Sequence, residues 1–80
     1  MSVFEKVQEI FQDVFDDTTL EIKREYSSAD IEDWDSLAQI NLITQMEKEF
    51  NLKFNMNDII KLQNIGDMID LIEKKQNEQL

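Results

Sequence analysis

Residues 34–54, WDSLAQINLITQMEKEFNLKF, determine the fold that this sequence predicts. A helix is expected over residues 36–50, because apolar side chains recur there at three- and four-residue steps. Asp35 precedes this helix, and Asp is one of the residue types that cap a helix by accepting a hydrogen bond from a first-turn amide. We expect the buried side of the helix to contain Leu37, Ile40, Ile43 or Leu42, Met46 and Phe50.

Three further helices are predicted on either side of this stretch. The first covers residues 2–15 and begins with Ser2 and Glu5, which form a capping box. A short helix is expected over residues 57–62, and the last helix begins after Asn64 as its N-cap and ends near residue 75, followed by a frayed tail at 76–80. The sequence therefore predicts an all-α four-helix bundle with three longer helices and one short one, in a single domain over residues 1–75.

A long loop, residues 16–35, connects the first helix to the second. Connections of this length are usually functional or disordered. We expect this one to be ordered, because it contains apolar side chains that would pin it to the core: Leu20, Ile22, Tyr26, Ile31 and Trp34. Residues 18–22, TTLEI, also have the composition of a short strand.

The composition excludes several classes of function. The 80 residues have a formal net charge of −10 and contain neither Cys nor His. The usual activated nucleophiles and transition-metal ligands are therefore missing, and we do not expect an enzyme. The charge disfavours nucleic acids and anionic membranes, and no apolar run approaches the length of a membrane span, about 20 residues. We expect a cytoplasmic monomer whose partners are proteins with basic patches.

The acidic run DIEDWD, residues 30–35, raises the question of a metal site. An EF-hand loop that began at Asp30 would need an oxygen ligand at its fifth position, Gly at its sixth and Glu at its twelfth, where this chain has Trp34, Asp35 and Asn41. The EF-hand pattern therefore fails. A loosely held divalent cation near Asp30, Glu32 and Asp33 remains an alternative to the favoured reading, a solvated acidic loop.

Ser36 is the serine whose position draws attention, because it lies where the long loop becomes a helix. A hydroxyl at a helix start is close to unpaired backbone N–H groups and to the positive end of the helix dipole. These features favour an attached anion such as a phosphodiester. On position alone, the alternative that Ser36 is an ordinary first-turn residue is favoured.

The residues around Ser36 resemble those of acyl carrier proteins. The resemblance lies in the triplet Asp35-Ser36-Leu37, in the helix that follows it through the acidic stretch 47–50 and the β-prone residues 52–54, and in the segment 64–67 that opens the last helix. It covers nearly the whole chain. It implies that a separate transferase esterifies Ser36 with phosphopantetheine from coenzyme A, and that acyl or aminoacyl groups are carried as thioesters to partner enzymes, in fatty acid biosynthesis or in a specialised pathway.

The same resemblance implies roles for neighbouring residues. Asp35 would present the serine to the transferase, and Leu37, Glu47 and Glu49 would contact acyl-transferring or synthase enzymes. Ala38 and Asn41 stand at partner-facing positions that are often acidic in fatty-acid carriers, so attraction to basic patches is expected to be weaker on this face. Trp34, in place of a small residue, looks more like the carriers of specialised pathways.

We also expect an apolar lining for an acyl chain between the last three helices, with plain core packing as the alternative. The residues predicted to form it are Met46, Phe54, Ile59, Leu62 and Met68. A second function remains open at this point: a small acidic helical interaction module that never bears a prosthetic group and places no demand on Ser36.

Overall fold

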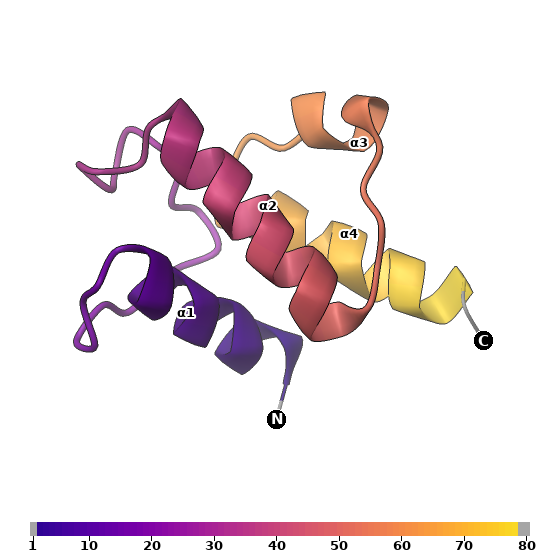
Figure 1. The fold of residues 1–80 in the computed structure, drawn as a ribbon, viewed down its shortest axis with the longest axis horizontal. Coiled ribbons are helices and arrows are strands. Elements are labelled where there is room, and N and C mark those ends of the chain that lie inside the picture. The colour runs from indigo at the N-terminus through magenta and orange to yellow at the C-terminus, as the bar shows by residue number, and fades with distance from the viewer. Residues whose placement is uncertain (1, 79–80) are drawn as a thin grey trace.

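The computed structural model describes residues 2–78, which form four helices in the order α1 (Val3–Val14), α2 (Ser36–Phe50), α3 (Met56–Ile60) and α4 (Ile65–Glu78). Figure 1 shows α1 and α2 side by side, α4 behind α2, and the short α3 set apart above them. The all-α class with three longer helices and one short one is confirmed. The strand considered for residues 18–22 is wrong, because those residues are irregular in the structure.

The starts of the three longer helices are each fixed by the side chain expected to cap them. The Ser2 Oγ accepts a hydrogen bond from the Glu5 N–H at 3.1 Å. The Asp35 Oδ1 accepts one from the Ala38 N–H at 2.8 Å. The Asn64 Oδ1 accepts one from the Asp67 N–H, also at 2.8 Å. Caps depend only on residues three positions apart, so the sequence predicts all three starts correctly.

The core lies where α1, α2 and α4 meet, and the long loop is fastened to it. Ile22 and Trp34 are buried, and Leu20, Tyr26 and Ile31 pack against the core as partly buried side chains. The loop also pairs with the start of α4, where the Ile65 N–H donates to the Tyr26 carbonyl at 2.9 Å and the Gly66 N–H donates to the Arg24 carbonyl at 2.8 Å. The expectation that these side chains pin the loop to the core is therefore confirmed.

The buried face of α2 differs from the prediction. Its buried residues are Ala38, Leu42, Ile43, Met46 and Phe50, whereas Leu37 and Ile40 are 67% and 61% exposed. With 3.6 residues per turn, steps of three from Leu37 to Met46 turn by about 180° around the helix, while steps of four from Ala38 stay on one side. The side chains of α1 and α4 cover the residues spaced by four from Ala38. The sequence of α2 alone does not reveal which of the two faces is covered.

Two boundaries also differ. The short helix is Met56–Ile60 rather than residues 57–62. Residues 76–78, placed in a frayed tail by the sequence, continue α4 as regular helix, and residues 79–80 lie outside the described range. Lys75 helps to explain the extension, because its Nζ lies 3.0 Å from the Asp58 Oδ2 and ties this end of α4 to α3. Within residues 2–78, no helix is long and apolar enough to cross a membrane.

Two truncations of equal kind on α2 test this burial pattern. Leu42→Ala should lower the free energy of unfolding by about 2–5 kcal/mol, because it leaves a cavity at a fully buried position. Ile40→Ala removes a largely exposed side chain and should cost less than about 1 kcal/mol. Urea unfolding measures both free energies. Equal losses of stability in the two variants would contradict the burial of Leu42 and the exposure of Ile40.

Candidate functional site

The start of α2 places a buried, a capping and an exposed residue in direct succession. Trp34 is 8% exposed and its ring meets that of Phe11 edge to face, with centroids 5.2 Å apart. Asp35 is in extended conformation and caps the helix. Ser36 is therefore the first helical residue, and its side chain is exposed.

Two backbone N–H groups at this helix start are available to an anion. The first-turn amides of a helix have no intrahelical acceptor. Asp35 accepts from the amide of Ala38, whereas those of Ser36 and Leu37 have no acceptor among residues 2–78. Together with the positive end of the helix dipole, these groups favour a phosphate attached to the Ser36 Oγ.

A pocket of about 410 Å³ adjoins Ser36. It is lined from the loop and α2 by residues that include Trp34, Gln39 and Ile40, and from the segment 59–68 by Ile59, Leu62, Gln63, Asn64 and Met68. An exposed hydroxyl beside a partly apolar pocket, at the positive end of a helix, suits a phosphate-linked arm that carries an apolar group.

Three of the five residues predicted to line such a pocket do so, namely Ile59, Leu62 and Met68. Met46 and Phe54 are not among the lining residues. Met46 is fully buried in the core, ten positions and about 15 Å along α2 from Ser36. Trp34, Gln39 and Ile40 were missed as lining residues. Gln39 and Ile40 stand three and four positions after Ser36 on the same helix, and this spacing, which places side chains on one face, could have suggested them.

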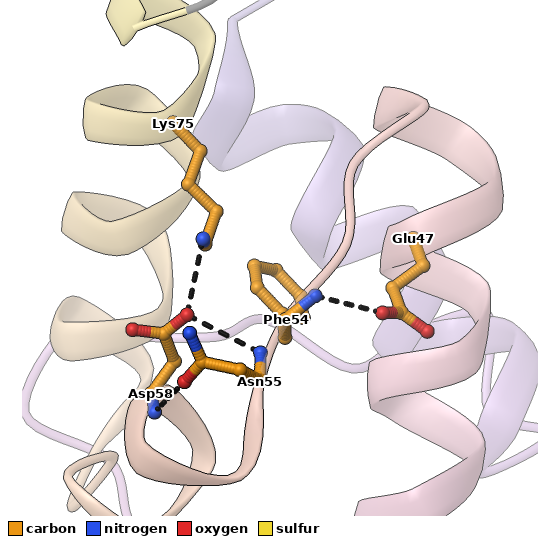
Figure 2. Close-up of polar contacts among 5 residues, drawn as sticks. All are labelled: Glu47, Phe54, Asn55, Asp58 and Lys75. Atoms are coloured by element: carbon orange, nitrogen blue, oxygen red, sulfur yellow. Dashed lines mark hydrogen bonds and ion pairs between the residues drawn. The ribbon is translucent and has the colours of Figure 1, made fainter.

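The wall formed by α3 is held by polar contacts rather than by burial, since none of its five residues is buried. Figure 2 shows these contacts. Asn55 and Asp58 form a capping box, and the Lys75 Nζ of α4 contacts the Asp58 carboxylate. On the other side, the Glu47 Oε2 of α2 accepts a hydrogen bond from the Phe54 N–H at 2.8 Å. The position of this pocket wall therefore depends on charged side chains of α2 and α4.

The residues predicted to meet partners are in different situations. Leu37 and Asn41 are exposed near Ser36, but Ala38 is buried and its side chain does not reach the surface. Glu47 holds the Phe54 amide, and the Glu49 Oε1 lies 2.7 Å from the Lys6 Nζ of α1. Both carboxylates thus have partners inside the molecule. These partners are too far away along the chain to be predicted from local sequence patterns.

The acidic run before α2 is exposed. Asp30, Glu32 and Asp33 are all accessible to solvent, and Asp30 accepts hydrogen bonds from the amide and hydroxyl of Ser27. Within residues 2–78, no group of three or more Asp or Glu side chains is arranged to hold a metal ion. The alternative of a loosely held divalent cation therefore gains no support from the geometry.

Comparison with known proteins identifies the family. The family model described as "Phosphopantetheine attachment site" matches residues 5–72. An acyl carrier protein of Solidesulfovibrio magneticus is 37% identical over 78 residues, which are 98% of this chain and 100% of the relative. The chain belongs to the acyl carrier protein family. An acyl carrier protein of Clostridium acetobutylicum is 34% identical over 95% of this chain and 99% of its own length.

The fold agrees with that of a solved acyl carrier protein. The solution NMR structure of the holo acyl carrier protein from Geobacter metallireducens matches with a TM-score of 0.90 and 39% identity, over 99% of this chain and 91% of that one. This acyl carrier protein is thus a carrier with covalently attached phosphopantetheine and not a catalyst, as the resemblance implied. The alternative of an interaction module without a prosthetic group is not favoured.

Two substitutions of the capping residue separate its hydrogen bond from its charge. Asp35→Ala should lower the free energy of unfolding by about 1 kcal/mol, because the Ala38 amide loses its acceptor. Asp35→Asn keeps an equally good cap and should change stability by only about a few tenths of a kcal/mol. If urea unfolding gave the same loss for both variants, the charge and not the cap would be the stabilising feature.

The contact between α3 and α4 should make stability depend on acidity. The hydrogen bond from Lys75, followed by that from the Asn55 amide, lowers the pKa of Asp58 below its ordinary value of 3.8. The stabilisation is fully present above 3.8 and is lost as pH falls through the lower pKa of the folded state. Lys75→Met should therefore be less stable than the wild type at neutral pH, with the difference closing below pH 3.8.

Lys74→Met is the matched control, since Lys74 is exposed and makes no ion pair within residues 2–78. Its unfolding midpoint in urea should differ little from that of the wild type across the same pH range. A Lys75→Met difference that persisted unchanged in acid would contradict the role given to the Asp58 carboxylate.

Proposed function

We propose that Ser36 is the residue to which phosphopantetheine is attached. The observation that carries this assignment is the position of its exposed side chain, at the first turn of α2 and beside the pocket. The sequence contains three other serines. Ser2 caps α1, the Ser27 Oγ contacts Asp30 and accepts from the Ala29 amide, and Ser28 lies in the loop without a helix start behind it.

The residues around Ser36 fit the group by charge and by shape. The free amides of Ser36 and Leu37 would hold the phosphate oxygens, and Asp35 would keep them in place by fixing the helix start. The pocket would receive the far part of the arm or its cargo. When bound, the group supplies the thiol that a sequence without Cys lacks, and acyl or aminoacyl groups are held on it as thioesters.

The partners we infer are a phosphopantetheinyl transferase and acyl-transferring or synthase enzymes with basic patches. Exposed acids at 30, 32, 33 and 35 lie immediately before Ser36 and would attract such patches. Exposed Leu37 and Asn41 would then make the short-range contacts. The pathway is fatty acid biosynthesis or a specialised biosynthesis.

We further infer that the carrier acts as a monomer in the cytoplasm. A net charge of −10 opposes self-association by mutual repulsion. The absence of Cys from the sequence is consistent with a reducing compartment.

The attachment is tested by incubating the apo protein with coenzyme A and a promiscuous phosphopantetheinyl transferase. The wild type should gain the mass of one phosphopantetheine in intact-mass spectrometry, and Ser36→Ala should gain none. Ser28→Ala is the control, because Ser28 lines the same pocket but does not begin a helix. It should be modified like the wild type. Modification of Ser36→Ala, or none of the wild type, would refute the assignment.

A further inference from the structure

The pocket beside Ser36 combines apolar walls with carboxamide side chains. Trp34, Ile40, Ile59, Leu62 and Met68 provide apolar surface, and Asp35 is the one charged residue in the lining. Gln39 from α2 and Asn64 from the start of α4 are half-buried and also line the pocket. What these two amides offer to a ligand depends on which of their ends is already occupied.

The oxygen ends of both amides are occupied by donors inside the protein. The Trp34 Nε1–H, which can only donate, lies 2.6 Å from the Gln39 Oε1. The Asp67 backbone N–H, also only a donor, lies 2.8 Å from the Asn64 Oδ1. Each hydrogen bond fixes the orientation of its amide, so the NH₂ ends remain available as donors to a ligand. Neither NH₂ group donates a hydrogen bond to another residue within 2–78.

Given attachment at Ser36, we propose that this pocket binds acyl groups that carry a ketone or hydroxyl oxygen in preference to plain alkyl chains. The Gln39 and Asn64 NH₂ groups donate to that oxygen, while the apolar walls cover the hydrocarbon. A plain alkyl chain in the same place would displace water from both donors and give them no acceptor in return, which is costly. The cargo class follows from this difference.

The arm itself has amide carbonyls, which are a second source of acceptor oxygens. Comparing carriers that differ only in the acyl group separates the two sources. An oxygen on the cargo acts only in the oxygenated form, whereas the arm is identical in all loaded forms and its contribution cancels between them.

The test loads the protein with a transferase from coenzyme A, octanoyl-coenzyme A and 3-oxooctanoyl-coenzyme A, and first confirms each product by intact mass. Failure at that stage would refute attachment rather than cargo preference. Thermal unfolding is then measured for each loaded form. The 3-oxooctanoyl form should melt about 4–8 °C above the octanoyl form, the shift expected for one net hydrogen bond in a domain of this size.

Gln39→Glu and Asn64→Asp remove the NH₂ donors but keep an acceptor for the Trp34 and Asp67 N–H groups. Either change should reduce the difference between the two acyl forms, and both together should abolish it. Gln45→Glu adds the same charge on an exposed position of α2 outside the pocket and should leave the difference intact. Each variant is compared with itself, so a general loss of stability cancels.

Equal melting temperatures of the two acyl forms in the wild type would overturn the proposal. So would a difference that survives in the double variant. If the double variant lowered the melting of the phosphopantetheine and octanoyl forms as much as that of the 3-oxooctanoyl form, the donors would not act on the cargo oxygen and the inferred cargo preference would be wrong.

Discussion

Trp34 must be buried and Ser36 must be exposed, although a single residue separates them along the chain. The indole meets Phe11 of α1 and brings the end of the long loop to the core, and Asp35 then starts α2 by accepting the Ala38 amide. This junction decides where the helix begins, and hence that Ser36 is its first residue. It also sets one side of the pocket, because Trp34 is part of the lining and orients Gln39.

The opposite wall of the pocket has a different physical basis. No residue of α3 is buried, and five residues are too few for an independently stable helix. Its position depends on the capping box, on Lys75 and on the bond between Glu47 and the Phe54 amide. The Lys75 and Asp58 side chains are half-buried, and an ion pair so close to solvent contributes little. The α3 segment, which forms this wall of the pocket, is therefore expected to open at lower free energy than the core, which suits a pocket that receives and releases a ligand.

Local features of this fold could be predicted from the sequence, and features that depend on distant partners could not. The caps at Ser2, Asp35 and Asn64 need only a residue three positions away. The buried face of α2 depends on where α1 and α4 pack, so Leu37 and Ile40 were placed on the wrong side. The partners of Glu47 and Glu49 likewise come from other segments. The proposal of Ser36 as the attachment residue rests on its motif, whereas Gln39 as a pocket residue required the structure.

The distribution of charge along α2 has a consequence for recognition. Residues 36–46 carry no charged side chain, and Glu47 and Glu49 farther along already bind Phe54 and Lys6. The exposed acids nearest to Ser36 along the chain, at 30, 32, 33 and 35, thus all lie before it. Long-range attraction would bring a basic surface to the loop end of α2 first, which orients the serine toward the partner. Salt should then slow association, whereas the lifetime of the complex depends on the apolar contacts of Leu37.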